Sequence, residues 1–67
     1  MKLTLKALRA NADMSQQDVA NKLGIATSTW MNWEKGRTFP NVKEIKKIES
    51  LFNVGYNDII FKPSITV

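Results

Sequence analysis

Apolar residues recur along this chain at intervals of three and four positions, and strand-like alternation is nearly absent before the last residues. Such intervals keep apolar side chains on one face of an α-helix. The series Leu5, Leu8 and Ala12 predicts a first helix from about Thr4 to Asn11. The pattern as a whole predicts an all-α domain.

Two short helices are predicted next, each followed by a glycine. Ser15 can cap the second helix with its hydroxyl, and Asp18, three positions later, completes a pattern like a capping box. Gly24 ends this helix, because glycine tolerates the positive φ of a helix C-terminus. The third helix is expected from about Thr27 to Lys35, with Gly36 after it. The apolar positions of the two helices are Val19, Ala20, Leu23, Trp30 and Trp33.

The C-terminal half predicts two further helices and a tail. Pro40 favours extended backbone at the residue before it, so the third helix cannot continue. Asn41 is a good cap for a fourth helix, and a short fifth helix is expected from about Tyr56 to Phe61. Pro63 ends that helix, and the residues after it favour extended structure. We therefore expect one domain over residues 1–61 and a tail over residues 62–67. The apolar positions of the last two helices are Ile45, Ile48, Leu51, Phe52, Ile59 and Ile60.

Composition narrows the possible functions. Ten Lys and Arg residues against six Asp and Glu give a formal net charge of +4. A basic excess favours polyanionic partners, although many small proteins are basic for solubility alone. The chain has neither Cys nor His, so no thiol nucleophile, no imidazole proton shuttle and no thiolate or imidazole metal ligand is available. We expect no enzyme, cofactor, metal or small-molecule substrate. Nothing resembles a signal peptide or membrane span, and the cytoplasm is the expected compartment.

The stretch from Gln16 to Lys35 has the features of a helix-turn-helix. Two short helices in this motif cross at about 90–120° through a tight turn. Ala20 is small enough for a close approach, and Gly24 can take the unusual dihedral angles of the turn. Helix lengths, turn position and apolar positions agree, so the motif is a stronger signal than any single residue.

This arrangement resembles the Cro/CI-type repressors, also called the XRE family, over about Leu3 to Ile60. The resemblance rests on Arg9, on the segment 15–24 (SQQDVANKLG), on the segment 33–36 (WEKG) and on Pro40. It implies a five-helix, lambda-repressor-like domain with its third helix in the DNA major groove. The function it implies is sequence-specific regulation of transcription, as a bacterial, phage or prophage repressor.

The resemblance also implies which residues contact DNA. The family's base-reading positions correspond to Thr27, Ser28 and Asn32. Asn can pair bidentately with adenine, and the Thr methyl group can touch that of thymine. The phosphate-contacting positions correspond to Gln16, Arg37, Thr38 and Lys43, with backbone amides after Asn41 assisting.

Each of these residues has a simpler alternative role. Asn32 could be an ordinary solvated helix residue, and Thr27 and Ser28 could serve only as helix caps. Arg37 and Lys43 could be solubilising charges.

A structural ion pair between Arg9 and Glu34 is also implied, because the family pairs these positions. The two Trp residues fall on the packing face, and we expect them in the core.

The sequence departs from the family pattern at three positions. Ala26 stands where Ser or Thr usually caps the third helix; alternatively the helix starts one residue later, with Thr27 as its cap. Asp13 stands where Gly is common, and Asp tolerates left-handed dihedral angles. Trp30 replaces a smaller aliphatic residue, which requires a repacked core.

The expected partners are duplex DNA with a palindromic operator and a second copy of the chain. Pairing is expected through the segment from about Tyr56 to Val67, where Phe61, Ile65 and Val67 are apolar; a frayed terminus is the alternative. The competing function is a protein-interaction module of the same fold, such as an antitoxin or anti-repressor. Polar residues on the third helix favour DNA, and Met31 favours a protein partner.

Overall fold

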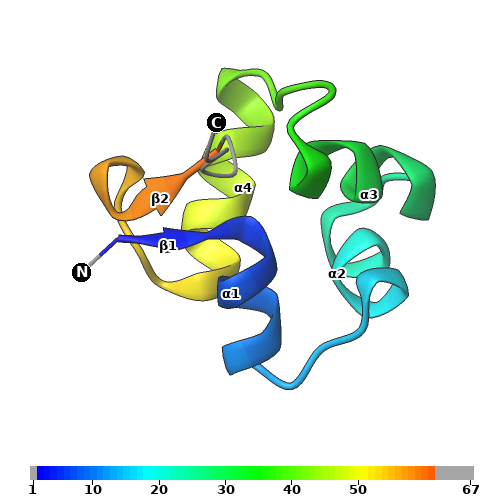
Figure 1. The fold of residues 1–67 in the computed structure, drawn as a ribbon, viewed down its shortest axis with the longest axis horizontal. Helices are drawn as coiled ribbons and strands as arrows, with labels where there is room; N and C mark the ends of the chain where they lie inside the picture. Colours follow the sequence, from blue (N-terminus) through cyan, green and yellow to red (C-terminus); the bar gives the residue numbers. More distant parts are fainter. Residues whose placement is uncertain (1, 62–67) are drawn as a thin grey trace, which may run out of the picture.

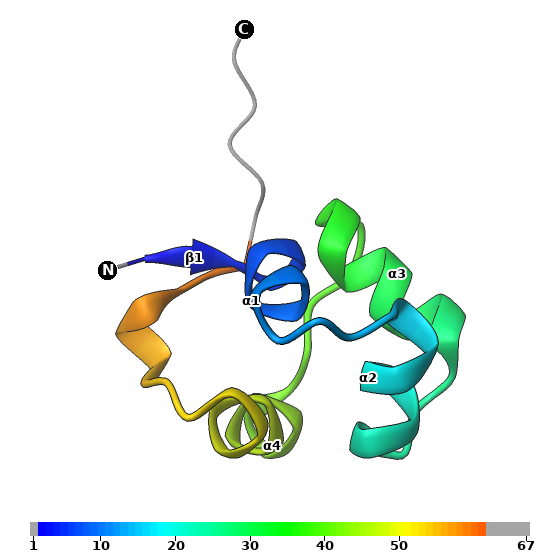
Figure 2. The same cartoon turned by 90° about the horizontal axis from the view of Figure 1, so that it is seen from below.

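A computed structural model describes residues 2–61 of the chain. The elements, in order, are β1 (Leu3–Thr4), α1 (Leu5–Asn11), α2 (Gln16–Leu23), α3 (Thr27–Lys35), α4 (Val42–Phe52), the 3-10 turn η1 (Tyr56–Asp58) and β2 (Ile59–Ile60). Both views place α1 between the two strands and the α2–α3 pair (Figures 1 and 2). Helices α2 and α3 therefore occupy one end of the molecule, and the strands occupy the other.

Side-chain caps begin three of the helices. The Thr4 hydroxyl accepts a backbone N–H of α1 at 3.1 Å. Ser15 and Asp18 form a complete capping box at α2, with both hydrogen bonds at 3.0 Å. Asn41 and Glu44 form another at α4, with hydrogen bonds of 2.8 and 3.1 Å. These contacts confirm the predicted starts of α2 and α4 and make Thr4 the cap of α1.

The ends of the helices also match their sequence signals. Gly24 and Gly36 have φ angles of 72° and 74°, which end α2 and α3 in the left-handed conformation. Asp13 has a φ of 55°, so it adopts the left-handed backbone conformation that a glycine commonly takes at this position. The third helix has the predicted bounds, and Ala26 occupies its cap position without a side-chain hydrogen bond. Thr27 is thus the first residue of α3, which decides between the two alternatives.

One buried cluster connects all four helices and β2. Trp30 is completely buried at its centre. Its ring meets that of Trp33 edge to face, with centroids 6.0 Å apart, and lies 6.4 Å from that of Phe52. The Trp residues are therefore core side chains and not a surface for stacking bases. The buried apolar residues are Leu5, Leu8, Val19, Ala20, Leu23, Trp30, Trp33, Ile48 and Ile59.

The predicted fifth helix, from Tyr56 to Phe61, is wrong. Only a single 3-10 turn forms in η1, and the chain then extends into β2. β2 pairs in parallel with β1, with Leu3 opposite Ile59. Two consecutive β-branched residues in β2 favour extended backbone, and six residues are too few for a stable helix. Residues 2–61 thus contain four α-helices and a small two-stranded sheet instead of five helices.

No helix within residues 2–61 is both long enough and apolar enough to cross a membrane. The predicted tail, residues 62–67, lies outside the described residues, and with it most of the segment expected to pair two copies.

Candidate nucleic-acid interface

Helices α2 and α3 pack directly against each other and form the helix-turn-helix. Ala20 is completely buried between them, which leaves room for the close approach of the two backbones. The turn is fixed by a backbone hydrogen bond of 3.0 Å from the Ile25 N–H to the Ala20 carbonyl oxygen. The predicted roles of Ala20 and Gly24 therefore agree with the observed geometry.

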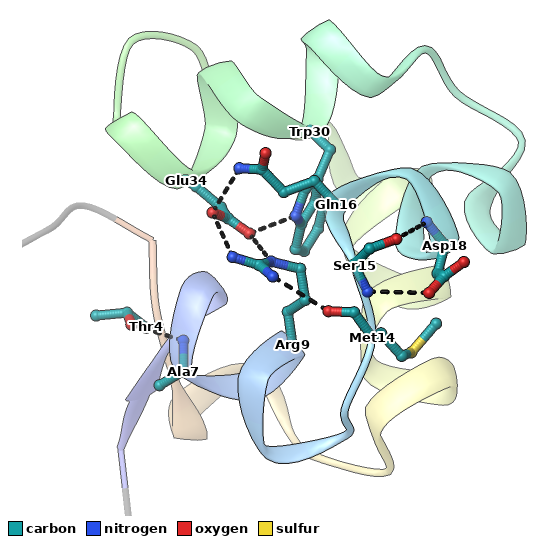
Figure 3. Close-up of polar contacts among 9 residues, drawn as sticks. All are labelled: Thr4, Ala7, Arg9, Met14, Ser15, Gln16, Asp18, Trp30 and Glu34. Carbon is teal, nitrogen blue, oxygen red and sulfur yellow. Dashed lines mark hydrogen bonds and ion pairs between the residues drawn. The ribbon is translucent and has the colours of Figure 1, made fainter.

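A carboxylate near the end of α3 connects this motif to α1 (Figure 3). Glu34 accepts from Arg9 Nε at 2.6 Å and from Gln16 Nε2 at 3.1 Å. It also accepts from Trp30 Nε1, one helical turn earlier, at 2.5 Å. The Glu34 side chain is only 6% exposed and that of Arg9 16%. Because its donors come from α1, α2 and α3, Glu34 holds the three helices at fixed relative positions.

Arg9 adds a second contact to this network. Its Nη1 donates to the Met14 carbonyl oxygen at 3.1 Å, in the loop between α1 and α2. The guanidinium thus satisfies a loop carbonyl group and a carboxylate together, which its planar fork of donors allows. The structure brings Arg9 and Glu34 together as the resemblance implies, and it adds two donors, from Gln16 and Trp30, that were not predicted from the sequence.

The base-reading candidates lie on α3: Ser28 and Asn32 are on the side opposite Trp30, and Thr27 is the first residue of the helix, one turn before Trp30. Ser28 is exposed, and Thr27 and Asn32 are half-buried. Ser28 and Asn32 are four positions apart, so they share one face of the helix. Trp30 and Trp33 occupy the buried face. The helix therefore presents a polar surface on one side while its other side is anchored in the core.

The phosphate-contacting candidates differ in their exposure and lie on different elements. Arg37, Thr38 and Lys43 are exposed, in the loop after α3 and at the start of α4. The Arg37 N–H donates to the Asn32 carbonyl oxygen at 3.0 Å, which fixes the start of this loop. Gln16 differs, because its side-chain amide is half-buried and already donates to Glu34. An amide nitrogen carries two N–H groups, so one of them remains free to donate to a phosphate oxygen.

Two further observations concern charge. The Ser15 backbone N–H donates to the Asp18 carboxylate, and the Ser15 hydroxyl accepts the backbone N–H of Asp18. The backbone contact first, and the Ser15 side chain second, favour the charged carboxylate and lower the pKa of Asp18 from its ordinary value. Within the part of the chain that the structure describes, no cluster of His, Cys, Asp or Glu could hold a metal ion.

A family model described as a helix-turn-helix domain matches residues 4–65, nearly the whole chain. The chain belongs to this helix-turn-helix family. Its relatives include an uncharacterized HTH-type transcriptional regulator of Methanocaldococcus jannaschii, 41% identical over 59 residues, which cover 88% of this chain and 89% of the relative. No solved structure matches this helix-turn-helix protein significantly.

Two further relatives are longer. The cryptic phage CTXphi transcriptional repressor RstR of Vibrio cholerae is 27% identical over 56 residues, which cover 84% of this helix-turn-helix protein and 50% of the repressor. The HTH-type transcriptional activator BcrR of Enterococcus faecalis is also 27% identical over 56 residues, 28% of its length. The chain thus spans half or less of these two proteins. The names of these relatives support the resemblance to XRE-type regulators.

Proposed function

We propose that this chain is a sequence-specific regulator of transcription that binds double-stranded DNA by inserting α3 into the major groove. The observation that carries the proposal is the two-sided character of α3. One side is anchored by buried Trp residues and the Glu34 network, and the other presents Ser28 and Asn32, with Thr27 at the first position of the helix. A rigid helix with free polar side chains suits the direct reading of base edges.

The proposed assignment of base contacts and phosphate contacts follows the chemistry of each side chain. Asn32 reads a base edge, with Thr27 and Ser28 beside it, because amides and hydroxyls distinguish the donor and acceptor patterns of the major groove. The phosphate contacts orient the domain without reading sequence. They are Gln16, Arg37, Thr38 and Lys43. A net charge of +4 agrees with such contacts.

The family resemblance and the relative RstR favour repression of a phage or bacterial promoter. A repressor of this kind acts by occupying a palindromic operator as a pair of chains. The activator BcrR shows that the name of a relative alone does not fix the sign of regulation, so an assay of promoter output has to accompany the binding assay.

The decisive experiment is selection of bound duplexes from a random pool, followed by titration of the selected duplex at several salt concentrations. We expect a consensus sequence and an affinity that falls with salt, with a log–log slope of about −0.9 per phosphate contact. Absence of binding to any duplex at micromolar concentration would refute the proposal and favour the protein-interaction function.

Two substitutions separate base reading from phosphate contact. Asn32→Ala should weaken binding of the selected duplex by about 1–3 kcal/mol and relax the preference at one base position. Lys43→Ala should weaken selected and unrelated duplexes about equally and lower the salt slope by about one contact. Lys6→Ala, on α1, is the control, since Lys6 is exposed and has no assigned role at the DNA surface. An unchanged consensus for Asn32→Ala would exclude Asn32 as a base reader.

A further inference from the structure

A groove of about 550 Å³ lies where the C-terminal end of α2 faces α4, its neighbour in the fold (Figure 2). Leu23 is buried and Leu51 half-buried, so these two apolar side chains form its base. The other residues that line it are exposed. They are Asn21, Lys22, Gly24, Lys47 and Ser50. We name this the lysine groove.

The lysine groove carries positive charge from both of its walls. Lys22 belongs to α2 and Lys47 to α4, and no carboxylate is among the described residues that line the groove. The ion pair found within residues 2–61 joins Arg9 to Glu34 and involves neither lysine. A ligand that enters here therefore meets two cations without partners, which favours negative charge on the ligand.

The proposed DNA contacts do not account for the lysine groove. None of its lining residues is a proposed base or phosphate contact. Gln16 is the first residue of α2, and Lys22 follows it by about 9 Å along the helix axis. Lys43 is the second residue of α4, and Ser50 follows it by about 10 Å. The groove thus lies toward the ends of α2 and α4 that are opposite to the proposed phosphate contacts.

A second groove, of about 310 Å³, meets the lysine groove at Leu51, which lines both. This apolar groove runs between the β1–α1 segment and the end of α4. Its lining is apolar except for Asn11, and the other members are Leu3, Leu8, Ala12, Phe52 and Val54. One segment that crosses Leu51 can therefore place acidic side chains beside the lysines and apolar side chains in the apolar groove.

The exposure of the lysine groove favours such a segment over a small molecule. Five of its seven lining residues are exposed, whereas small-molecule sites usually bury about 70–90% of their ligand. The groove also lies at the C-terminal end of α2, which carries a partial negative charge. A compact anion such as phosphate is therefore held poorly there, while carboxylates on a longer segment can reach the lysine side chains from outside.

Charge also indicates that the segment belongs to another protein. Residues 62–67 contain Lys62 and neither Asp nor Glu, so this part of the chain does not complement the two lysines. A second copy of the chain is a poor match as well, because it has the same net charge of +4. Like charges that approach each other across an interface disfavour binding.

We propose that the lysine groove and the apolar groove together bind an acidic, partly apolar segment of a partner protein. Lys22 and Lys47 pair with its carboxylates, and the apolar groove receives the apolar side chains that follow them. The chain then recruits a partner through α2 and α4, with a surface separate from α3. This binding needs no DNA, so the inference does not rest on the proposed function.

The test begins with selection of random displayed peptides of about twelve residues against the full chain. We expect a consensus with Asp or Glu next to apolar residues. The synthetic form of the selected peptide is then titrated into the ¹⁵N-labelled chain, and the amide signals of Lys22, Gly24 and Ser50 should shift. The double variant Lys22→Glu, Lys47→Glu should bind the peptide at least about tenfold more weakly. Ser50→Trp should also weaken binding, because it fills the groove without changing the charge.

The matched control is the double variant Lys6→Glu, Lys46→Glu. It changes the net charge by the same amount at two exposed lysines outside both grooves, and it should keep the peptide affinity within about threefold. Equal losses in the two double variants would show attraction to net charge alone and overturn the inference. A consensus without acidic residues, or amide shifts confined to α3, would overturn it as well.

Binding of the selected duplex separates the inference from the proposed function. The double variant Lys22→Glu, Lys47→Glu should lose no more affinity for the duplex than the control variant does. A much larger loss would show that these lysines contact DNA, and the inference would be wrong while the proposed function stands. Failure to select any duplex refutes the proposed function instead and leaves the peptide measurement intact.

Discussion

Replacing Glu34 with Ala removes the acceptor on which three donors converge. Arg9 Nε, Gln16 Nε2 and Trp30 Nε1 all lie within 3.1 Å of its carboxylate. The guanidinium of Arg9 is 16% exposed, so it cannot recover full hydration after its partner is lost. The completely buried Trp30 also loses the acceptor of its indole N–H. The variant thus leaves a charge and a polar N–H group desolvated and unpaired.

The expected loss in free energy of unfolding is about 3–5 kcal/mol, the usual cost of deleting one partner of a buried ion pair. A chain of this length is stable by about 3–10 kcal/mol in total. The melting temperature should fall by at least about 12 °C, since each kcal/mol corresponds to about 4–8 °C in a domain of this size. Glu34→Ala is therefore expected to be partly or wholly unfolded at 37 °C.

Far-UV circular dichroism during heating and urea denaturation measures this loss. Glu49→Ala is the control, because Glu49 is also half-buried as a residue but lies on α4, outside the Glu34 network. Glu34→Gln should fall between the two, since it keeps an acceptor and loses the charge. A double-mutant cycle with Arg9→Ala should give a coupling energy of about 0.5–3 kcal/mol. A Glu34→Ala melting temperature within about 2 °C of wild type would show that the network contributes nothing to stability.

Three further predictions concern the helix ends. Asp18 has a lowered pKa in the folded chain, so its contribution to stability is present above the unfolded-state pKa and is lost as pH falls through the folded-state value; the difference in melting temperature between wild type and Asp18→Ala should shrink below about pH 4, and a pH-independent difference would contradict this. Asn41→Ala should lower the free energy of unfolding by about 1 kcal/mol in urea denaturation, and an unchanged value would mean that the α4 cap is dispensable. Ala26→Ser should raise the free energy of unfolding by about 0.5–1 kcal/mol, because the new hydroxyl can cap α3; an unchanged value would show that it does not cap the helix.

The parts of the fold that follow from local chemistry could be predicted from the sequence. Ser15 with Asp18 begins α2, and Gly24 ends it, because a cap hydroxyl and a positive φ act within one turn of chain. The same reasoning gave the bounds of α3 between Ala26 and Gly36. The sequence left open whether Ala26 or Thr27 is the cap of α3, and the structure places Ala26 at the cap position.

The segment from Tyr56 to Ile60 could not be predicted in this way. Its conformation depends on β1, which lies more than fifty positions earlier in the chain. No spacing rule within the segment reveals that partner, although the two β-branched residues of β2 weakly favour a strand. The Glu34 network was also only partly predictable. The spacing of four between Trp30 and Glu34 was a usable signal for their hydrogen bond, whereas the donor from Gln16 depends on how α2 crosses α3.

The two ends of α3 are held differently, and this bears on how it could read DNA. Its C-terminal half contains Glu34 and Trp33, which are fixed by the ion pair and by the core. Its N-terminal end has no side-chain cap, because Ala26 cannot provide one. A Thr at the cap position would use its hydroxyl to accept a backbone N–H of the helix. Thr27 is instead the first helical residue, so its hydroxyl does not serve as the cap. Thr27 and Ser28 can therefore adjust to a base edge while the axis of α3 stays fixed by Glu34, two residues beyond Asn32. If α3 reads bases as proposed, its specificity depends on the buried carboxylate of Glu34 as well as on Thr27, Ser28 and Asn32.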